Sequence, residues 1–335
     1  MLDMYQNETP YSYEEMIEIE KGIYEKLVIR DDEVPVEVNI NEILGRDIEV
    51  FNDKEYNMPQ NIFLIEGYEG NVIVGRKIWS VLSREGKINA INCSMLTSSM
   101  LLGILKSCYR KKPNIRVEYF PLKNGEKLTI FDSVKRNLNN DVYYPFNFRD
   151  YASGQEKESP KTGWPFNLER KAYLGYGEYH IREFTKKYFN GENMENMIVY
   201  DPACSTGEFL NTFKKNHNTC ITIGHDLSSE MIAYAKDFVD EALCCDAIES
   251  PLPDGSVDIM FLRFLNSEVV CTGKAHANME KLISKVKTKG RIVCFGHTPV
   301  LIKLEWCEAH GLRCLNKIGY DDDHDAIFQY YVFER

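Results

Sequence analysis

The 335-residue sequence lacks any run of 18 or more apolar residues, which is about the length a membrane-spanning helix needs. Its first residues, MLDMYQNETPYSYEE, contain neither the basic segment nor the apolar segment that opens a secretory signal. We therefore expect neither a membrane span nor export, and predict a soluble, cytoplasmic protein.

Basic residues are fewer than acidic ones, and cysteine patterns typical of metal sites are absent from the sequence. The chain has 40 Lys and Arg against 51 Asp and Glu, a formal net charge of −11. Such a charge repels polyanions and does not favour nucleic acid as a partner. The ten cysteines are scattered, with no CxxC or Cys/His zinc spacing. We predict reduced thiols and no metal site.

The length is sufficient for two domains, each with its own core. Residues 140–168 are rich in Pro, Gly, Ser and charge and show no sustained hydrophobic period, as in a linker or lid. We predict a mixed α/β N-terminal domain over residues 1–150, a linker or lid over 151–168, and a second domain over 169–335.

Several elements of the first domain are expected from local patterns. Residues 62–75, IFLIEGYEGNVIVG, predict two strands around a turn. Residues 98–113 predict a helix, and residues 115–122 predict a strand. Asn124-Gly125 stands between two β-rich runs and predicts a hairpin.

The second domain shows a regular alternation of strand and helix patterns. A helix is expected over residues 169–189, followed by strands over 198–201, 220–226, 241–247, 257–264 and 290–298, with helical segments between them. This alternation predicts a mostly parallel sheet covered on both faces. The last two strands, 313–321 and 325–335, leave no room for a crossover and predict an antiparallel hairpin.

The stretch IVYDPACSTGEFL, residues 198–210, combines a buried strand, a turn of small residues and the start of a helix. Small residues let the backbone turn tightly, and the helix N-terminus offers unpaired N–H groups to a ligand. A turn without a ligand has the same local pattern. Two further acids, Asp226 and Asp246, lie at the ends of the next two predicted strands, at the same edge of the predicted sheet.

These features resemble a class I S-adenosylmethionine-dependent methyltransferase, with a Rossmann-like, mostly parallel seven-stranded sheet that ends in an antiparallel hairpin. The resemblance covers roughly residues 170–335 and rests on DPACSTGEF, IGHDLS, CCDAIES, PDGSVDIMFLRF and KTKGRIVCFG in that order. It implies S-adenosyl-L-methionine as the cofactor. By the same resemblance, Asp226 would hold the ribose hydroxyls and Asp246 the adenine amino group.

The resemblance also implies a set of cofactor-binding residues. They are Tyr176, Asp201, Pro202, Ala203, Ser205, Gly207, Asp226, Leu227, Met231, Asp246, Ala247 and Arg263. Ala203 and Ser205 stand where the family often has glycine. Acids at the mouth of the site suit the cationic sulfonium and α-amino groups of the cofactor.

Catalysis of transfer from a sulfonium depends largely on alignment, worth about 7–11 kcal/mol in favourable cases, so a general base is optional. The candidates are His180, His297 and Asn266. For either histidine a structural role is the alternative. Tyr173, Tyr176 and Tyr179 lie just before the cofactor loop, and with the aromatic linker residues 164–166 they predict a lid. The alternative for Tyr173 and Tyr176 is the core face of a helix.

The predicted activity is methyl transfer to a small-molecule metabolite, a peptide or a carrier-bound natural-product intermediate. DPACSTG also resembles the DPACGSG loop of adenine-N6 methyltransferases, but their NPPY or DPPY stretch is replaced here by FLRFLNSEVV. A catalytically silent, cofactor-binding partner subunit is another alternative. The N-terminal domain, residues 1–150, would supply an acceptor pocket, a lid or a dimer interface. The acceptor atom, and whether the chain forms a homodimer, stay open.

Overall fold

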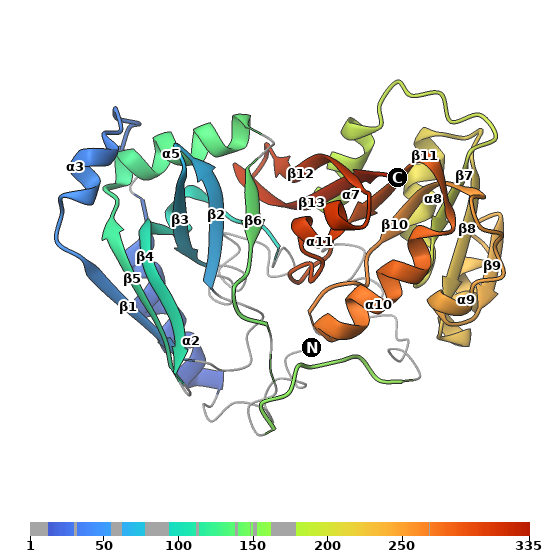
Figure 1. Ribbon diagram of the computed structural model, residues 1–335, viewed down its shortest axis with the longest axis horizontal. Helices are drawn as coiled ribbons and strands as arrows, with labels where there is room; N and C mark the ends of the chain where they lie inside the picture. Colours follow the sequence, from blue (N-terminus) through green and yellow to red (C-terminus); the bar gives the residue numbers. More distant parts are fainter. Residues whose placement is uncertain are drawn as a thin grey trace. The chain divides into compact units, whose positions relative to one another are not determined.

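The computed structural model (Figure 1) contains two compact units. Unit 1 comprises residues 1–156 with 320–328, and unit 2 comprises residues 157–319 with 329–335. The structure describes residues 13–29, 32–54, 62–77, 94–111, 114–137, 140–147, 149, 153–161, 179–267 and 269–335.

Unit 1 is built on an antiparallel sheet with the strand order β1-β5-β4-β3-β2-β6. The strands are β1 (Glu49–Lys54), β2 (Ile62–Tyr68), β3 (Asn71–Arg76), β4 (Leu101–Lys111), β5 (Asn114–Pro121) and β6 (Asp141–Tyr143). The helices are α2 (Tyr13–Leu27), α3 (Ile40–Leu44), the 3₁₀ turn η1 (Ser98–Met100) and α5 (Asn124–Arg136). The strands predicted within residues 62–75 and 115–122 are confirmed.

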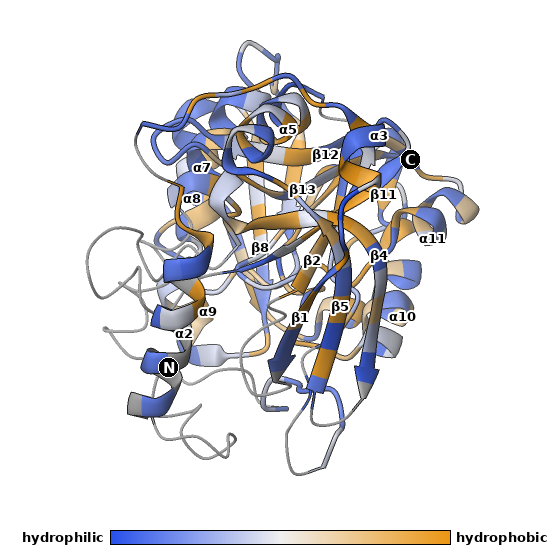
Figure 2. Cartoon of the chain, turned by 90° about the vertical axis from the view of Figure 1, so that its left-hand side faces the viewer, coloured by the Kyte–Doolittle hydropathy of each residue, from blue (hydrophilic) through white to orange (hydrophobic). Residues whose placement is uncertain are grey.

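The helix predicted over residues 98–113 is wrong, because most of this segment is strand β4. β4 lies between β3 and β5, and its first residues, Leu101–Ile104, are buried. Its apolar residues are therefore consecutive and do not alternate, a pattern shared with buried helices. The strand is apolar in its first half and hydrophilic toward its end (Figure 2).

The hairpin predicted at Asn124-Gly125 is also wrong, since helix α5 begins there. The Glu126 carboxylate accepts a hydrogen bond from the Lys123 backbone N–H at 2.7 Å, which satisfies a donor at the start of the helix. Arg46 donates to both oxygens of the same carboxylate. These contacts, distant in sequence, override the local turn signal.

Unit 2 has a seven-stranded sheet with the order β12-β13-β11-β10-β7-β8-β9. The strands are β7 (Ile198–Asp201), β8 (Ile221–Asp226), β9 (Glu241–Cys244), β10 (Val257–Leu262), β11 (Val286–Cys294), β12 (Arg313–Asp321) and β13 (Ala326–Glu334). Neighbouring strands among β7, β8, β9, β10 and β11 are parallel, and β13 pairs antiparallel to β11. The Rossmann-like sheet with a C-terminal hairpin is therefore confirmed.

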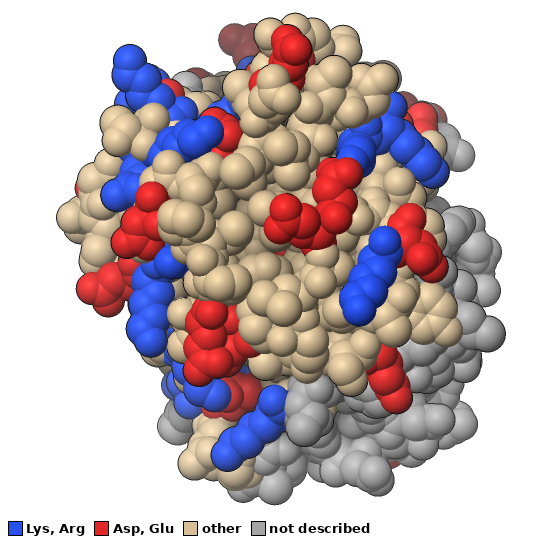
Figure 3. Space-filling model, turned by 90° about the vertical axis from the view of Figure 1, so that its right-hand side faces the viewer, with Lys and Arg blue, Asp and Glu red and all other residues tan. Residues whose placement is uncertain are grey.

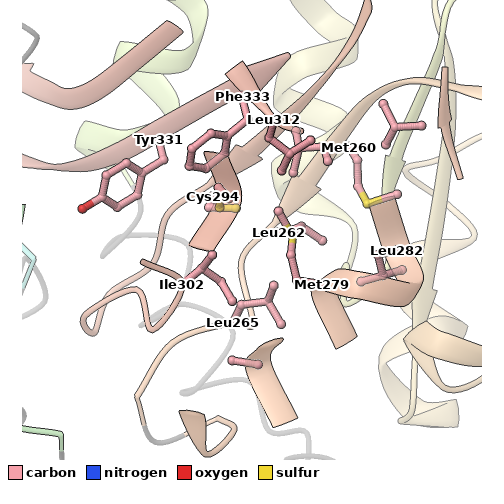
Figure 4. Close-up of a cluster of buried hydrophobic side chains, with 14 of the residues drawn as sticks. Met260, Leu262, Leu265, Met279, Leu282, Cys294, Ile302, Leu312, Tyr331 and Phe333 are labelled. Atoms are coloured by element: carbon pink, nitrogen blue, oxygen red, sulfur yellow. The ribbon is translucent and has the colours of Figure 1, made fainter. Parts of the chain in front are cut away.

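Helices alternate with these strands. They are α7 (Tyr179–Tyr188), α8 (Glu208–Asn216), α9 (Ser229–Ala235), the 3₁₀ turn η2 (Ala247–Glu249), α10 (Thr272–Ile283) and α11 (Leu304–Ala309). Figure 4 shows one part of the core, where Met260 and Leu262 of β10 lie near Met279 of α10 and Phe333 of β13. β10 is apolar along nearly its whole length, as expected for an inner strand of a parallel sheet.

Candidate functional site

The loop between β7 and α8, residues 201–207, is held from the neighbouring strand β8. The Cys204 N–H donates to the His225 carbonyl oxygen at 2.7 Å. The Ser205 N–H donates to Asp226 Oδ2 at 2.9 Å. The loop conformation is thus fixed by the protein itself, at the carboxyl ends of the strands where open α/β sheets bind ligands.

Asp226, the last residue of β8, has a geometry that suits a ribose diol. Its Oδ1 accepts from the Ser228 N–H and its Oδ2 from the Ser205 N–H, both at 2.9 Å. A carboxylate has about four acceptor positions, so each oxygen can accept one more hydrogen bond. Burial raises the pKa of Asp226, while the two N–H groups and Arg263 oppose that shift. The residues present therefore fit the cofactor that the resemblance implies.

Asp201, the last residue of β7, is fully buried and paired with Arg263, which follows β10. Arg263 Nε donates to Asp201 Oδ2 at 2.7 Å, and Asp201 Oδ1 accepts from the Ala203 N–H at 3.0 Å. Arg263 Nη2 also donates to the carbonyl oxygen of Cys204 at 3.2 Å. The acidic mouth expected from the sequence is thus partly neutralised, because the charge of Asp201 is compensated inside the protein.

Ser205 and Gly207 both have left-handed backbone conformations, with φ of 53° and 76°. This explains why the family often has glycine at the position of Ser205. The Ser205 hydroxyl donates to Met231 Sδ at 3.6 Å, and Met231 is buried in α9. A Cβ on Gly207 would lie 3.2 Å from Ala235 Cα, so Gly207 also permits the close approach of α9.

The remaining predicted cofactor residues in the described part of the chain follow β7, β8 and β9. Pro202 is buried in the loop after β7. Asp246 follows β9, and its Oδ1 accepts from the Ile248 N–H at 3.1 Å, with Ala247 buried beside it. Leu227 is 47% exposed directly after Asp226. Tyr176 lies outside the described residues.

The three catalytic candidates lie in different settings. His180 is buried in α7, a helix that packs against α8. His297 is half-buried in the loop after β11. Asn266 is 4% exposed in the loop after β10. Asn266 and His297 both follow the carboxyl ends of strands, and the catalytic role of all three residues stays a prediction.

His225 is a buried residue of β8, inside the strand predicted over residues 220–226. Its Nδ1 lies 2.8 Å from the Tyr200 hydroxyl oxygen. Burial lowers the pKa of His225 to about 4, so the ring is neutral at physiological pH. Because Tyr200 and His225 are 25 positions apart on neighbouring strands, only the strand pairing reveals this contact.

Surface charge, metal-binding groups and helix length bear on whether the described residues could bind nucleic acid, a metal ion or a membrane. Lys and Arg are interspersed with Asp and Glu on the face in Figure 3, without a continuous basic stripe among the residues described there. Within the described part of the chain, no group of three or more His, Cys, Asp or Glu could hold a metal ion. No described helix is both long and apolar enough to cross a membrane.

Residues 200–294 match a family model described as a methyltransferase domain. Isonocardicin synthase from Nocardia uniformis subsp. tsuyamanensis is 31% identical over 281 residues, which are 83% of this chain and 92% of that protein. This similarity is longer than the segment from residue 157 to the C-terminus, so it must extend into unit 1.

Solved structures with a similar fold cover about half of the chain. A SAM-dependent methyltransferase from Aquifex aeolicus is 20% identical, with a TM-score of 0.40, over 51% of this chain and all of that one. Magnesium protoporphyrin IX methyltransferase from Synechocystis PCC 6803, solved with bound SAH, is 13% identical, with a TM-score of 0.38, over 51% of this chain and 89% of that one.

Proposed function

This chain belongs to the class I S-adenosylmethionine-dependent methyltransferases and to one family with isonocardicin synthase, and we propose that it transfers a methyl group to a small-molecule acceptor in natural-product biosynthesis. S-adenosylmethionine is its cofactor. The observation that carries the proposal is Asp226, whose two oxygens are oriented by backbone N–H groups and keep acceptor capacity for a ribose diol.

The residues of the site act mainly by binding and orientation. When bound, the cofactor supplies a carbon that its positively charged sulfur has already activated. Asp226 would accept hydrogen bonds from the ribose, and the loop of residues 201–207 would offer its backbone to the methionine end. Asp246 and Leu227 would lie beside the adenine. Such positioning is worth about 7–11 kcal/mol of the barrier in favourable cases.

The acceptor class is supported by the relative rather than by a described pocket. Isonocardicin synthase is named for a product, and its similarity to this chain reaches into unit 1. We therefore assign unit 1 a part in the recognition of the acceptor. Besides small-molecule metabolites, the proposed acceptors include peptides and carrier-bound natural-product intermediates. Asn266, His297 and His180 are the residues proposed to act at the acceptor end, and the segment that contains Tyr176 is the proposed lid.

The test uses the purified full chain and two measurements. Calorimetry with S-adenosylhomocysteine should show binding that Asp226→Ala weakens. Incubation with methyl-labelled S-adenosylmethionine and a small-molecule metabolite extract should move the label onto an acceptor and release S-adenosylhomocysteine, both seen by mass spectrometry.

Each other outcome has a distinct meaning. Release of 5′-methylthioadenosine, with no label on the acceptor, would show that a different carbon of the sulfonium is transferred and would contradict methyl transfer. Binding of S-adenosylhomocysteine without any transfer would favour the catalytically silent partner subunit.

A further inference from the structure

Asn266 belongs to a group of buried polar side chains between the loops that follow β10 and β11. The group consists of Asn266, Ser267, Thr298 and Gln329, each less than 8% exposed. Asn266 forms an isolated antiparallel bridge with Val300. The Ser267 N–H donates to the Pro299 carbonyl oxygen at 2.9 Å. The two loops are therefore joined at the carboxyl edge of the sheet.

The other side chains of this group are used within the protein. Thr298 Oγ1 donates to the Ser267 carbonyl oxygen. Gln329 Oε1 accepts from the Val300 N–H at 2.9 Å, and its Nε2 donates to the Tyr331 hydroxyl oxygen at 3.2 Å. Their hydrogen bonds fix the shape of the two loops around Asn266.

Asn266 Oδ1 differs, because it is buried and has no hydrogen-bond partner within the described part of the chain. An unsatisfied buried acceptor lowers stability, and each such group in a folded protein needs an explanation. The carboxamide is also held closely, since a Cβ on Gly296 would lie only 2.3 Å from Asn266 Nδ2. Asn266 thus keeps a closely packed, unused acceptor oxygen in the loop that follows β10, at the edge of the sheet where ligands of open α/β folds bind.

We propose that Asn266 Oδ1 accepts a hydrogen bond from the nucleophilic N–H or O–H of the acceptor, which makes the substrate an amine, an amide or a hydroxyl compound. This inference rests on the proposed function and names the acceptor chemistry at the same site. The acceptor atom gains a bond to the transferred carbon, and the electron pair of the broken carbon–sulfur bond stays on sulfur. The acceptor proton leaves to water, because an amide oxygen at neutral pH does not take it up.

The first test needs no ligand and compares the same substitution at two asparagines. Asn266→Leu removes an unsatisfied polar group, so the melting temperature of the free protein should stay the same or rise. Asn316 is equally buried, but its Nδ2 donates to Ile318 O at 2.9 Å and Tyr330 O at 2.8 Å. Asn316→Leu should therefore lower the melting temperature. An equal loss in Asn266→Leu would show a structural role and overturn the proposal.

The second test follows label transfer in the metabolite extract that supports turnover by the wild-type chain. Asn266→Leu should lose at least tenfold in transfer while its affinity for S-adenosylhomocysteine stays within twofold. Asn266→Asp, which keeps an acceptor oxygen, should retain most of the transfer. A collapse of S-adenosylhomocysteine affinity in folded Asn266→Leu, or a label on sulfur or carbon of the product, would overturn the proposal. No binding of S-adenosylhomocysteine by the wild type would instead contradict the proposed function.

Discussion

Arg263 and Asp201 form a nearly buried ion pair, with 2.7 Å between Arg263 Nε and Asp201 Oδ2. The same guanidinium lies 5.0 Å from the Phe209 ring centroid and donates to the Cys204 carbonyl oxygen. Arg263, which directly follows β10, therefore compensates the charge of Asp201 and also holds the loop backbone at Cys204. The loop is organised by the protein before any ligand binds.

Arg263→Ala should unfold more easily and bind S-adenosylhomocysteine at least tenfold more weakly than the wild type. Removal of one partner from a buried ion pair costs about 3–5 kcal/mol, because the other charge is left uncompensated. Chemical denaturation and calorimetry measure the two effects. Arg263→Lys should recover part of both, since lysine restores the charge but not the several directed donors of arginine.

Arg291→Ala is the matched control for Arg263→Ala. Arg291 also pairs with a carboxylate, that of Glu192, but at a more exposed position away from the loop. Its removal should cost less than that of Arg263, because both partners are partly exposed, and leave S-adenosylhomocysteine affinity unchanged. Wild-type affinity in folded Arg263→Ala would show that the loop does not depend on this pair.

Gly207→Ala should be more destabilising than Gly191→Ala, although both glycines have nearly the same positive φ, 76° and 79°. Alanine in a left-handed conformation costs roughly 1–2 kcal/mol at either position. Only at Gly207 would the new Cβ also meet Ala235 and Val239, at 3.2–3.3 Å, whereas nothing lies within 4 Å at Gly191. Denaturation curves give the difference, and only Gly207→Ala should lose S-adenosylhomocysteine binding. Equal effects at both sites would leave backbone strain as the sole cause.

The sheet of unit 2 and the positions of its acids were predictable from local sequence. Apolar runs of strand length ended at Asp201 and at Asp226, and parallel strands bring such ends to one edge of the sheet. Unit 1 was harder, because β4 has the consecutive apolar residues of a buried helix. In α5, the tertiary contact of Arg46 with Glu126 stabilises a start that the turn signal did not predict.

The internal contacts of the site were not predictable, since they join residues that are distant in the sequence. Arg263 follows Asp201 by 62 positions, and Asn266 meets the loop after β11 through a bridge to Val300. The residue types alone indicated that Asp201 and Asn266 belong to a polar site. The partners of these residues, Arg263 and Val300, follow from which strands are neighbours in the sheet, and local sequence patterns do not predict that order.

Asp226→Ala should weaken S-adenosylhomocysteine binding about tenfold or more, because charge-assisted hydrogen bonds to the ribose, worth about 1.5–3 kcal/mol, are lost. Titration calorimetry measures the change. Asp258→Ala is the control, since Asp258 lies near the opposite, amino end of β10 and binds Lys287 and the Ile198 N–H. Unchanged affinity in folded Asp226→Ala would contradict the ribose assignment.

Stability should fall as the pH is lowered from about 6.5 to about 4, through the buried His225. Its pKa in the folded protein is lowered to about 4 by burial, whereas an unfolded histidine titrates near 6.5. Between these values the unfolded state binds more protons, so the free energy of unfolding rises with pH. The contribution that is lost on acidification is at most roughly 3 kcal/mol.

His225→Gln removes this titration and keeps an acceptor for the Tyr200 hydroxyl, which lies 2.8 Å from His225 Nδ1 in the wild type. Its free energy of unfolding, measured in denaturant at pH 6.5 and pH 4.5, should therefore change less than that of the wild type. His310→Gln, at an exposed position, should follow the wild type. If His225→Gln lost as much stability as the wild type over this range, other groups would account for the acid sensitivity, and His225 would not be the buried neutral histidine that links β8 to β7.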